Sequence, residues 1–273
     1  MHSVSILGYG WLGLALGIHL KKEGMLVIGS TTSKEKQSKL MELELDTVVF
    51  SLTPQAQREE KHRLFASEVL VITLPALTRS GEGEFYLAQL QSLKKLIEGS
   101  SIEKVLMISS TGIYPEHPME ERYTEESLQE GISPGNPILL QAERFMEEER
   151  TYAFTCLRLG GLMGPGRIPG NYVSGKPEVV GHARVNYIHQ FDAVRMIAWI
   201  IQKGLWDQTF NGVAPYHPRR KEIYEQNVAS FGISPPRSYA QFQKGVDRVI
   251  DSRKILETGF QFAFPDPLHF EYY

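Results

Sequence analysis

The stretch "ILGYGWLG" at residues 6–13 decides how the rest of the chain is interpreted. It begins in a short apolar run that is typical of a β-strand and leads into residues 12–22, where apolar residues recur at helical spacing. A strand, a glycine-rich turn and a helix in this order are typical of a loop that holds a dinucleotide pyrophosphate. Glycine allows the tight turn, and the helix begins with N–H groups that attract an anion. The sequence therefore predicts cofactor contacts by Gly8, Tyr9, Gly10, Trp11, Leu12 and Gly13.

The second expected strand, at residues 25–29, ends without the acidic residue that an NAD site usually places near the adenosine ribose. The chain continues with hydroxyl groups and one cation, which suit the additional phosphate of NADP. We predict NADP as the preferred cofactor, with NAD as the alternative, and contacts by Ser30, Thr31, Thr32, Ser33 and Lys34. A solvated first-turn residue is the other interpretation of Lys34. Thr32 and Glu35 have the spacing of a capping box for the next helix.

Beyond this point, short apolar runs alternate with segments of helical period. The runs lie at residues 47–52, 69–75, 105–110 and 153–159, and the helical segments lie at 84–98 and 138–150. Several runs are apolar at consecutive positions, as in strands buried on both faces of a parallel sheet. The pattern predicts an α/β fold in which a doubly wound parallel sheet, the Rossmann arrangement, occupies residues 1–165. We expect a small C-terminal α/β lobe at 166–273 to bind the substrate, and its segment 185–215 to return to the Rossmann core.

Two local details follow from the helical spacing. One buried face of the segment 84–98 is expected to carry Phe85, Leu90, Leu93, Leu96 and Ile97. Asp192 is expected to cap a helix that ends at Gly204.

The composition restricts the class of protein. The chain has 273 residues, of which 42% are hydrophobic, and a formal net charge of −3. This balance gives no support for nucleic acid or an anionic membrane as a partner, and no apolar run is long enough to span a bilayer. Cys156 is the only cysteine, which excludes an internal disulfide and a cysteine-rich metal site, and its apolar surroundings favour a reduced core residue. We expect a cytoplasmic protein that has no metal site and acts on a small molecule.

Four further motifs carry a family resemblance. They are "VLMISSTGIYPEHP" (105–118), "LRLGGLMGPGR" (157–167), "VNYIHQFDAV" (185–194) and "VDRVIDSRKILETGF" (246–260). Together with the glycine loop, they resemble the extended short-chain dehydrogenase/reductase family, which is typified by nucleotide-sugar epimerases and dehydratases. The resemblance covers nearly the whole chain and is closest to an atypical subgroup of epimerase-like proteins whose first loop reads GxGxLG.

The resemblance implies a catalytic role for the end of the fifth strand. A Ser or Thr at this point helps to polarise the substrate in the family, and Ser110 and Thr111 occupy it here. Tyr114 follows closely and is the candidate to replace a missing proton donor, with packing as the alternative interpretation.

The proton donor of the family is a Tyr with a Lys four positions later, because the Lys lowers the pKa of the Tyr. Residues 133–149, where this pair is expected, contain neither Tyr nor Lys. An alignment on the helix residue Glu143 places Gly135 and Leu139 at the two positions. The pair Tyr172–Lys176 has the right spacing but lies in a Gly- and Pro-rich loop, so the role does not transfer to it.

Further contacts are expected around the cofactor and the substrate. Additional cofactor contacts are predicted at Thr73, Leu74, Pro75, Gly160 and Gly161. Substrate contacts are predicted at Arg167, Asn186, His189 and Arg248, with structural roles as the alternative for His189 and the arginines. The resemblance allows a homodimer through the helices expected at 84–98 and 138–150.

Two functions are consistent with these motifs. The first is an NAD(P)-dependent oxidoreductase or epimerase-like enzyme that acts on a sugar-like or nucleotide-linked carbonyl or hydroxyl group. The retained hydroxyl residues and the substrate lobe favour it. The alternative is a catalytically impaired NADP-binding sensor or regulatory protein, which the missing Tyr and Lys favour.

Overall fold

The computed structural model describes residues 2–55, 62–76, 81, 83–115, 122–128, 131–241 and 247–273. The chain divides into two compact units, each built from separate stretches of sequence. The first unit comprises Met1–Ser109, Pro137–Leu157 and Ile197–Thr209, and the second comprises Ser110–Asn136, Arg158–Met196 and Phe210–Tyr273.

A seven-stranded sheet organises the first unit, with the strand order β10-β7-β5-β4-β1-β2-β3. Its strands are β1 (Ser3–Leu7), β2 (Leu26–Thr31), β3 (Thr47–Val49), β4 (Val69–Ile72), β5 (Lys104–Ser110), β7 (Ala153–Leu159) and β10 (Gln208–Gly212). The pairs β1–β2, β1–β4, β2–β3 and β4–β5 are parallel. The predicted α/β fold with a parallel Rossmann sheet is thus confirmed.

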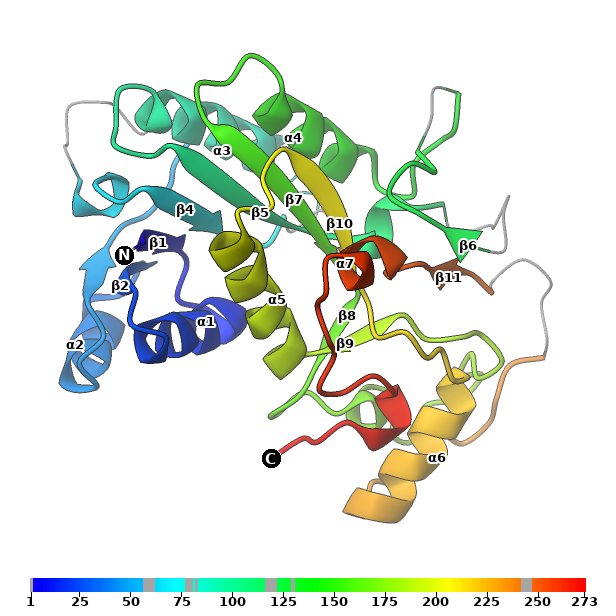
Figure 1. Ribbon diagram of the computed structural model, residues 1–273. Helices are drawn as coiled ribbons and strands as arrows, with labels where there is room; N and C mark the ends of the chain where they lie inside the picture. Colours follow the sequence, from blue (N-terminus) through cyan, green and yellow to red (C-terminus); the bar gives the residue numbers. More distant parts are fainter. Residues whose placement is uncertain are drawn as a thin grey trace. The chain divides into compact units, whose positions relative to one another are not determined.

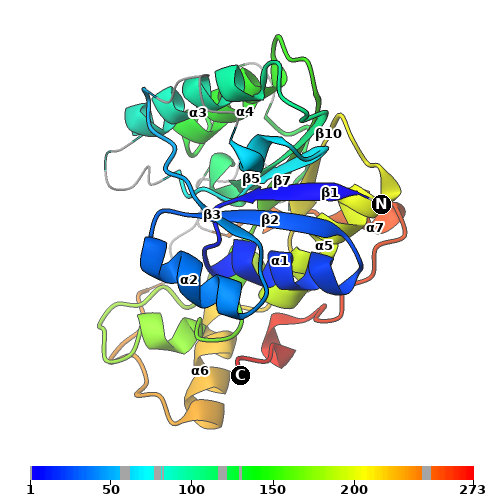
Figure 2. The same ribbon diagram turned by 90° about the vertical axis from the view of Figure 1, so that its left-hand side faces the viewer.

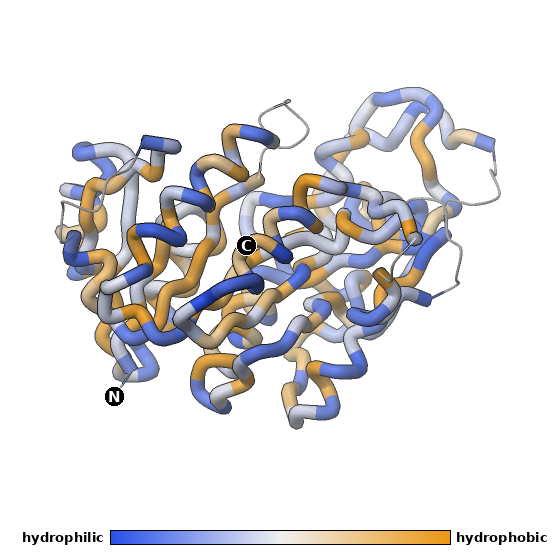
Figure 3. Tube along the Cα trace, turned by 90° about the horizontal axis from the view of Figure 1, so that it is seen from above, coloured by the Kyte–Doolittle hydropathy of each residue, from blue (hydrophilic) through white to orange (hydrophobic). Residues whose placement is uncertain are grey.

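Helices cover both faces of this sheet. The helices α1 (Trp11–Lys22) and α2 (Lys34–Glu42) lie on one face, and α3 (Gly83–Ile97) and α4 (Pro137–Glu147) lie on the other (Figure 2). Along the helices, hydrophobic and hydrophilic residues alternate in short groups (Figure 3). A hydrophobic core of the unit joins strand residues such as Leu70 and Ile72 to Leu90 and Leu93 of α3, all fully buried. Cys156 belongs to the same core, as predicted.

Three local predictions were wrong. Phe85 is 50% exposed, and Tyr86 takes its place on the buried face of α3. The residue that caps α2 is Ser33 and not Thr32, because β2 continues to Thr31 and the helix begins only at Lys34. The helix α5 (Gln190–Lys203) begins before Asp192, which therefore lies in its first turn.

The second unit contains short elements. They are η3 (Thr111–Ile113), β6 (Arg122–Tyr123), β8 (Gly161–Met163), η4 (Pro169–Tyr172), β9 (Tyr187–His189), α6 (Arg220–Phe231), β11 (Val249–Ile250), α7 (Arg253–Glu257) and η5 (Pro267–His269), together with the start of α5. Two parallel strand pairs, β6–β11 and β8–β9, join segments that are distant in the sequence (Figure 1). The carboxylate of Asp192 accepts the N–H groups of Ala263 and Phe264 at 2.8 and 2.7 Å, so it holds the C-terminal segment instead of capping a helix.

Candidate functional site

The loop after β1 has a backbone conformation that requires glycine at its first position. Gly8 has a φ of +107°, which a residue with a Cβ rarely adopts. Its N–H donates to Ser30 Oγ at 2.9 Å, and its carbonyl oxygen accepts a hydrogen bond from Thr73 Oγ1 at 2.7 Å. The loop is therefore fixed by the end of β2 on one side and by the residue after β4 on the other.

Gly10 and Gly13 are required for different reasons. A Cβ on Gly13 would lie 2.1 Å from the carbonyl oxygen of Gly8, so this glycine lets α1 pack against the loop. A Cβ on Gly10 would meet no protein atom within 4 Å. Gly10 directly precedes Trp11, the first residue of α1, and has no side chain to accept the first N–H groups of the helix. Open space beside Gly10 and a helix start without a side-chain cap fit the pyrophosphate of a dinucleotide.

The side chain of Tyr9 does not reach this space. Tyr9 is 2% exposed, and a Cβ on Gly17 or Gly29 would lie 2.8 or 2.0 Å from its ring. The ring is thus held between α1 and β2, and burial raises its pKa. Leu12 is also buried, so the predicted cofactor contacts of Tyr9 and Leu12 are limited to backbone atoms.

The turn between β2 and α2 uses most of its hydroxyl groups for its own structure. Ser30 Oγ accepts the Gly8 N–H, and Thr31 Oγ1 accepts the Ser33 N–H at 3.4 Å. Ser33 Oγ accepts the N–H of Lys36 at 3.2 Å and so caps α2. The side chains of Thr32 and Lys34, which were also predicted to contact the cofactor, are exposed and take no part in these hydrogen bonds.

Lys36 is a candidate that the sequence analysis missed. Its Nζ donates to the carbonyl oxygen of Tyr9 at 2.5 Å, which places an ammonium group directly beside the glycine loop. Lys34, the predicted contact, directly follows the hydroxyl residues in the sequence. Lys36 lies two residues later in α2, where the helix turns its side chain back toward the loop.

The residues after β4 border the same loop. Thr73 holds the carbonyl oxygens of Leu7 and Gly8 at 3.0 and 2.7 Å. The side chain of Leu74 would lie 3.6 Å from a Cβ on Gly8, whereas Pro75 is exposed. The structure therefore brings Thr73 and Leu74 together with the glycine loop, as expected for a cofactor site.

In the second unit, the turn after β5 carries the predicted catalytic residues. Ser110 Oγ accepts the N–H of Gly112 at 3.1 Å, and Thr111 is buried. Tyr114 is fully buried, and its hydroxyl donates to Asn211 Oδ1 at 2.8 Å. The same hydroxyl accepts from Arg158 Nη1 at 3.0 Å. Burial raises the pKa of Tyr114 to about 12, although Arg158 opposes this change.

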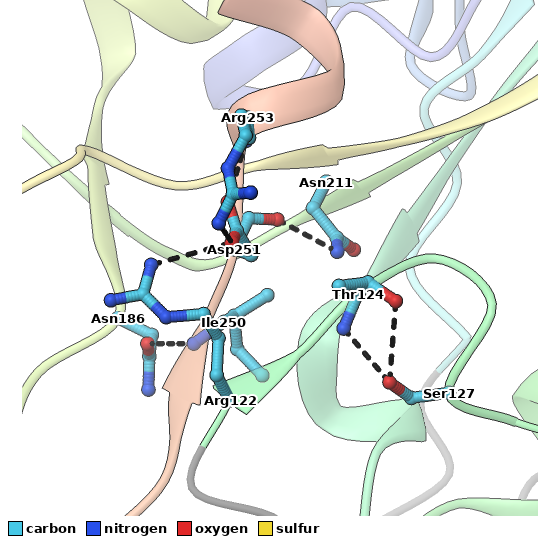
Figure 4. Close-up of polar contacts among 8 residues, drawn as sticks. All are labelled: Arg122, Thr124, Ser127, Asn186, Asn211, Ile250, Asp251 and Arg253. Carbon is cyan, nitrogen blue, oxygen red and sulfur yellow. Dashed lines mark hydrogen bonds and ion pairs between the residues drawn. The ribbon is translucent and has the colours of Figure 1, made fainter.

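Asn211 links this tyrosine to residues that sequence analysis missed. The N–H of Asn211 donates to Glu125 Oε1 at 2.6 Å. Figure 4 shows its second contact, in which Asn211 Nδ2 donates to the carbonyl oxygen of Asp251 at 3.0 Å. Arg158 Nη1 also donates to the carbonyl oxygen of Glu125, and burial raises the pKa of the Glu125 carboxyl. No sequence motif contains these residues together, because each comes from a different segment. With these contacts, Tyr114 is part of a packed polar network.

Gly135 occupies the position that the resemblance gives to the tyrosine of the proton-donor pair. Its N–H donates to the carbonyl oxygen of Ile113 at 2.9 Å. A Cβ on Gly135 would lie 2.2 Å from the carbonyl oxygen of Tyr114 and 2.8 Å from that of Gly112. The backbone of the turn after β5 therefore leaves no room for any side chain at this position.

The other positions named for the pair carry either a buried apolar side chain or exposed side chains. Leu139 is buried in α4 of the first unit. Tyr172 ends η4 with 54% exposure, and Lys176 is an exposed residue in the loop that follows.

Asn186 and His189, both predicted substrate contacts, bind backbone groups. Asn186 Nδ2 donates to the carbonyl oxygen of Arg248 at 2.9 Å. Its Oδ1 accepts the N–H of Ile250 at 2.8 Å, as Figure 4 shows. His189 Nε2 lies 2.7 Å from the carbonyl oxygen of Glu271, and its Nδ1 accepts the N–H of Phe191 at 3.2 Å. Burial lowers the pKa of His189. These contacts hold the C-terminal segments in place.

Arg248 and the two glycines after β7 are also engaged with the backbone. Arg248 Nη1 donates to the carbonyl oxygens of Tyr114 and Pro115 at 2.5 and 2.6 Å. The N–H groups of Gly160 and Gly161 donate to the carbonyl oxygens of Gly212 and Asn186 at 2.9 and 2.8 Å. Arg167 is half-buried.

Two further kinds of site are absent from the residues that the structure describes. No group of three or more His, Cys, Asp or Glu side chains is placed to hold a metal ion. Within the same residues, no helix has the length and apolar character needed to cross a membrane.

A comparison with known proteins places the chain in a family. Protein YeeZ of Escherichia coli strain K12 is 31% identical to it over 272 residues, which cover 98% of both chains. This chain belongs to the YeeZ family. No known protein-family model matches the sequence.

Solved structures show which fold this YeeZ-family chain has. A UDP-glucose 4-epimerase from Thermotoga maritima, solved with UDP-glucose, has a TM-score of 0.78 at 16% identity, and the match covers 97% of this chain and 96% of the epimerase. The human epimerase family protein SDR39U1, solved with NADPH, has a TM-score of 0.69 at 16% identity, with the same coverage of 97% and 96%. The predicted extended short-chain dehydrogenase/reductase fold is thus confirmed.

Proposed function

We propose that this protein binds NADP(H) at the loop after β1 and uses it in an oxidoreductase or epimerase-like reaction. The observation that carries the proposal is the backbone at Gly10, where a Cβ would enter open space beside the start of α1. The packing of the protein does not need a glycine there, whereas close approach of a pyrophosphate does. The NADPH in the structure of human SDR39U1 supports a nicotinamide cofactor on this fold.

A preference for NADP over NAD is supported by the groups around the turn after β2. The turn is exposed at Thr32 and Lys34, and the Lys36 ammonium lies beside the loop. Two cations and a hydroxyl suit a phosphate on the ribose, and no acidic residue is present between β2 and Lys34 to hold a free ribose hydroxyl. We assign Lys36 to this role together with Lys34.

Ser110 and Thr111 are proposed to polarise the substrate oxygen. A bound nicotinamide supplies or accepts a hydride. Because Ser110 Oγ accepts the Gly112 N–H, its own hydroxyl proton remains available to donate to a substrate oxygen. The substrate is a sugar-like or nucleotide-linked carbonyl or hydroxyl compound, in keeping with the UDP-glucose in the Thermotoga epimerase. Arg167 is the predicted substrate contact that we retain as a direct one, and we assign positioning roles to Asn186, His189 and Arg248.

A second candidate function is an NADP-binding sensor or regulatory protein without turnover. The position of Gly135 favours it, because the carbonyl oxygens of Gly112 and Tyr114 leave no room for a proton-donating side chain. Tyr114 would be a poor substitute, since its hydroxyl is engaged with Asn211 and Arg158 and its pKa is raised to about 12.

Calorimetric titration of the protein with NADPH and NADH tests cofactor binding and preference. We expect Lys36→Ala and Lys34→Ala to weaken the binding of NADPH but not of NADH. Equal affinities of the unaltered protein for the two cofactors would contradict the assignment of the phosphate site.

Oxidation of NADPH in the presence of carbonyl compounds then distinguishes the two functions. The enzyme hypothesis predicts substrate-dependent oxidation that is lost in Ser110→Ala/Thr111→Ala. Tight NADPH binding without substrate-dependent oxidation in either protein would leave the sensor as the supported function.

Self-association through α3 and α4 is the remaining part of this proposal. The two helices pack against each other, and α3 presents Phe85 to solvent. We expect a dimer by light scattering and a shift toward monomer in Phe85→Glu.

A further inference from the structure

Two arginines of the second unit converge on one carboxylate. Arg122 Nη1 and Arg253 Nη2 lie 3.3 and 2.9 Å from Asp251 Oδ2 (Figure 4). The Asp251 side chain is 7% exposed, whereas those of Arg122 and Arg253 are 55% and 68% exposed. One buried carboxylate thus neutralises only one of two guanidinium groups that remain open to solvent.

A second pair of arginines lies on neighbouring backbone. Arg184 and Arg219 are directly opposite each other in an antiparallel bridge, and both are exposed. Arg184 Nε lies 3.9 Å from Asp247 Oδ2, and Arg219 Nη1 donates to the carbonyl oxygen of His182 at 2.5 Å. Like charges at directly opposite positions destabilise a strand pair, and an anion that binds both would remove this repulsion.

His217 connects the two pairs. Its Nδ1 lies 2.9 Å from the carbonyl oxygen of Val185. Burial lowers the pKa of His217, and the charges of Arg122 and Arg184 lower it further, whereas the hydrogen bond to Val185 and the charge of Asp251 act in the opposite direction. The charges of both Arg122 and Arg184 therefore act on the same imidazole ring. We refer to Arg122, Arg184, Arg219 and Arg253 as the arginine cluster.

Within the described part of the chain, three carboxylates face the cluster. They are Asp251, Asp247 and Glu222, and the Glu222 carboxylate accepts the backbone N–H of Arg219 at 2.6 Å. Arg220 and Lys221 directly follow Arg219 in the sequence; Lys221 Nζ lies 3.7 Å from Glu225 Oε1, so Arg220 is the one that adds positive charge. Positive charge is thus in excess at this surface.

We propose that the arginine cluster binds a small molecule that carries two or more neighbouring phosphate or carboxylate groups. Each guanidinium presents paired N–H donors that match such oxygens. Two separate pairs of arginines favour a ligand with more than one anionic group. The formal net charge of −3 for the whole chain disfavours a long polyanion such as nucleic acid. The proposal goes beyond the cofactor function, because no member of the cluster belongs to the glycine loop or to its unit.

Calorimetric titration of the full chain with sodium pyrophosphate at low salt tests the cluster. We expect binding that weakens as NaCl is added, because the contacting groups are exposed. Arg184→Gln and Arg122→Gln should each weaken binding about ten-fold, as expected for the loss of one charged hydrogen-bonding group. Arg144→Gln is the matched control, since Arg144 is an exposed arginine of α4 in the other unit.

Asp247→Asn provides a test of opposite sign. It removes a competing negative charge and keeps an oxygen for the Arg184 N–H, which donates to Asp247 Oδ1 at 2.9 Å. Pyrophosphate should therefore bind this variant several-fold more tightly. Circular dichroism checks that the variant keeps the fold of the unaltered protein.

Three results would overturn the proposal. The first is no binding of pyrophosphate, and none of citrate as a carboxylate probe, to the unaltered protein. The second is an equal effect of Arg184→Gln and Arg144→Gln. The third is loss of NADPH binding in Arg184→Gln, which would assign the cluster to the cofactor. If the unaltered protein does not bind NADPH, the proposed cofactor function is wrong. The arginine cluster is still tested by the pyrophosphate titration, which does not depend on NADPH.

Discussion

Replacing Gly10 by Ala should separate cofactor binding from folding. Gly10 has φ and ψ of −78° and −158°, an extended conformation that alanine adopts, and the new Cβ would meet no protein atom within 4 Å. Alanine restricts the unfolded chain, which stabilises the protein by about 0.4–1 kcal/mol, but it is a poorer residue than glycine before a helix. These effects oppose each other, so the free energy of unfolding should change by less than about 1 kcal/mol.

Cofactor affinity should respond differently. The added methyl group occupies the space into which a pyrophosphate must come, so we expect NADPH binding to weaken at least ten-fold, or by about 1.4 kcal/mol. Urea unfolding followed by tryptophan fluorescence measures stability, and calorimetric titration measures affinity.

Gly13→Ala is the matched control for this experiment. Its Cβ would lie 2.1 Å from the carbonyl oxygen of Gly8 and 3.0 Å from Thr73 Oγ1, so the backbone must shift. Such crowding costs about 1–3 kcal/mol, and stability and binding should therefore fall together. Unchanged NADPH affinity in Gly10→Ala at unchanged stability would refute the placement of the pyrophosphate.

Three further predictions concern stability and are measured by urea unfolding. Tyr9→Phe should raise the free energy of unfolding by about 1 kcal/mol, because the buried Tyr9 hydroxyl has no hydrogen-bond partner among the described residues. A decrease would show that the hydroxyl is satisfied. Ser33→Ala should lower it by about 1 kcal/mol and Thr32→Ala much less, since Ser33 Oγ caps α2; the reverse order would restore Thr32 as the cap. Burial lowers the pKa of His189, so the unfolded chain binds the proton more readily, and stability should fall as the pH decreases below about 6.5. This decrease should be smaller in His189→Gln, and an identical pH profile in both proteins would assign the effect to other groups.

The fold could be predicted from the sequence where neighbouring residues determine the structure. The glycine spacing predicted the turn between β1 and α1 because the conformation of Gly8 and the close packing of Gly13 are set within six residues. Short apolar runs in the sequence predicted the strands β1, β2, β3, β4, β5 and β7 of the main sheet. Their ends were less predictable, and β4 stops at Ile72 although the apolar run continues to Pro75.

The details of the site depend on contacts between distant segments. Lys36 reaches the carbonyl oxygen of Tyr9 across 27 residues, and Asn186 binds backbone groups more than 60 residues away. A residue type alone does not distinguish an amide that holds a backbone from one that holds a substrate. For this reason the chemically suitable residues could be predicted from the sequence, whereas the hydrogen bonds that already occupy some of them could not.

The crowding around Gly135 determines how a proton-donating side chain could be engineered into this protein. The Cβ of a tyrosine introduced at this position would already clash with the carbonyl oxygens of Tyr114 and Gly112, whatever the orientation of its ring. The turn is further held by the bond from Gly135 to Ile113 and by those from Arg248 to Tyr114 and Pro115. A designer must therefore rebuild the main chain between Gly112 and Pro115 first and graft the side chain second.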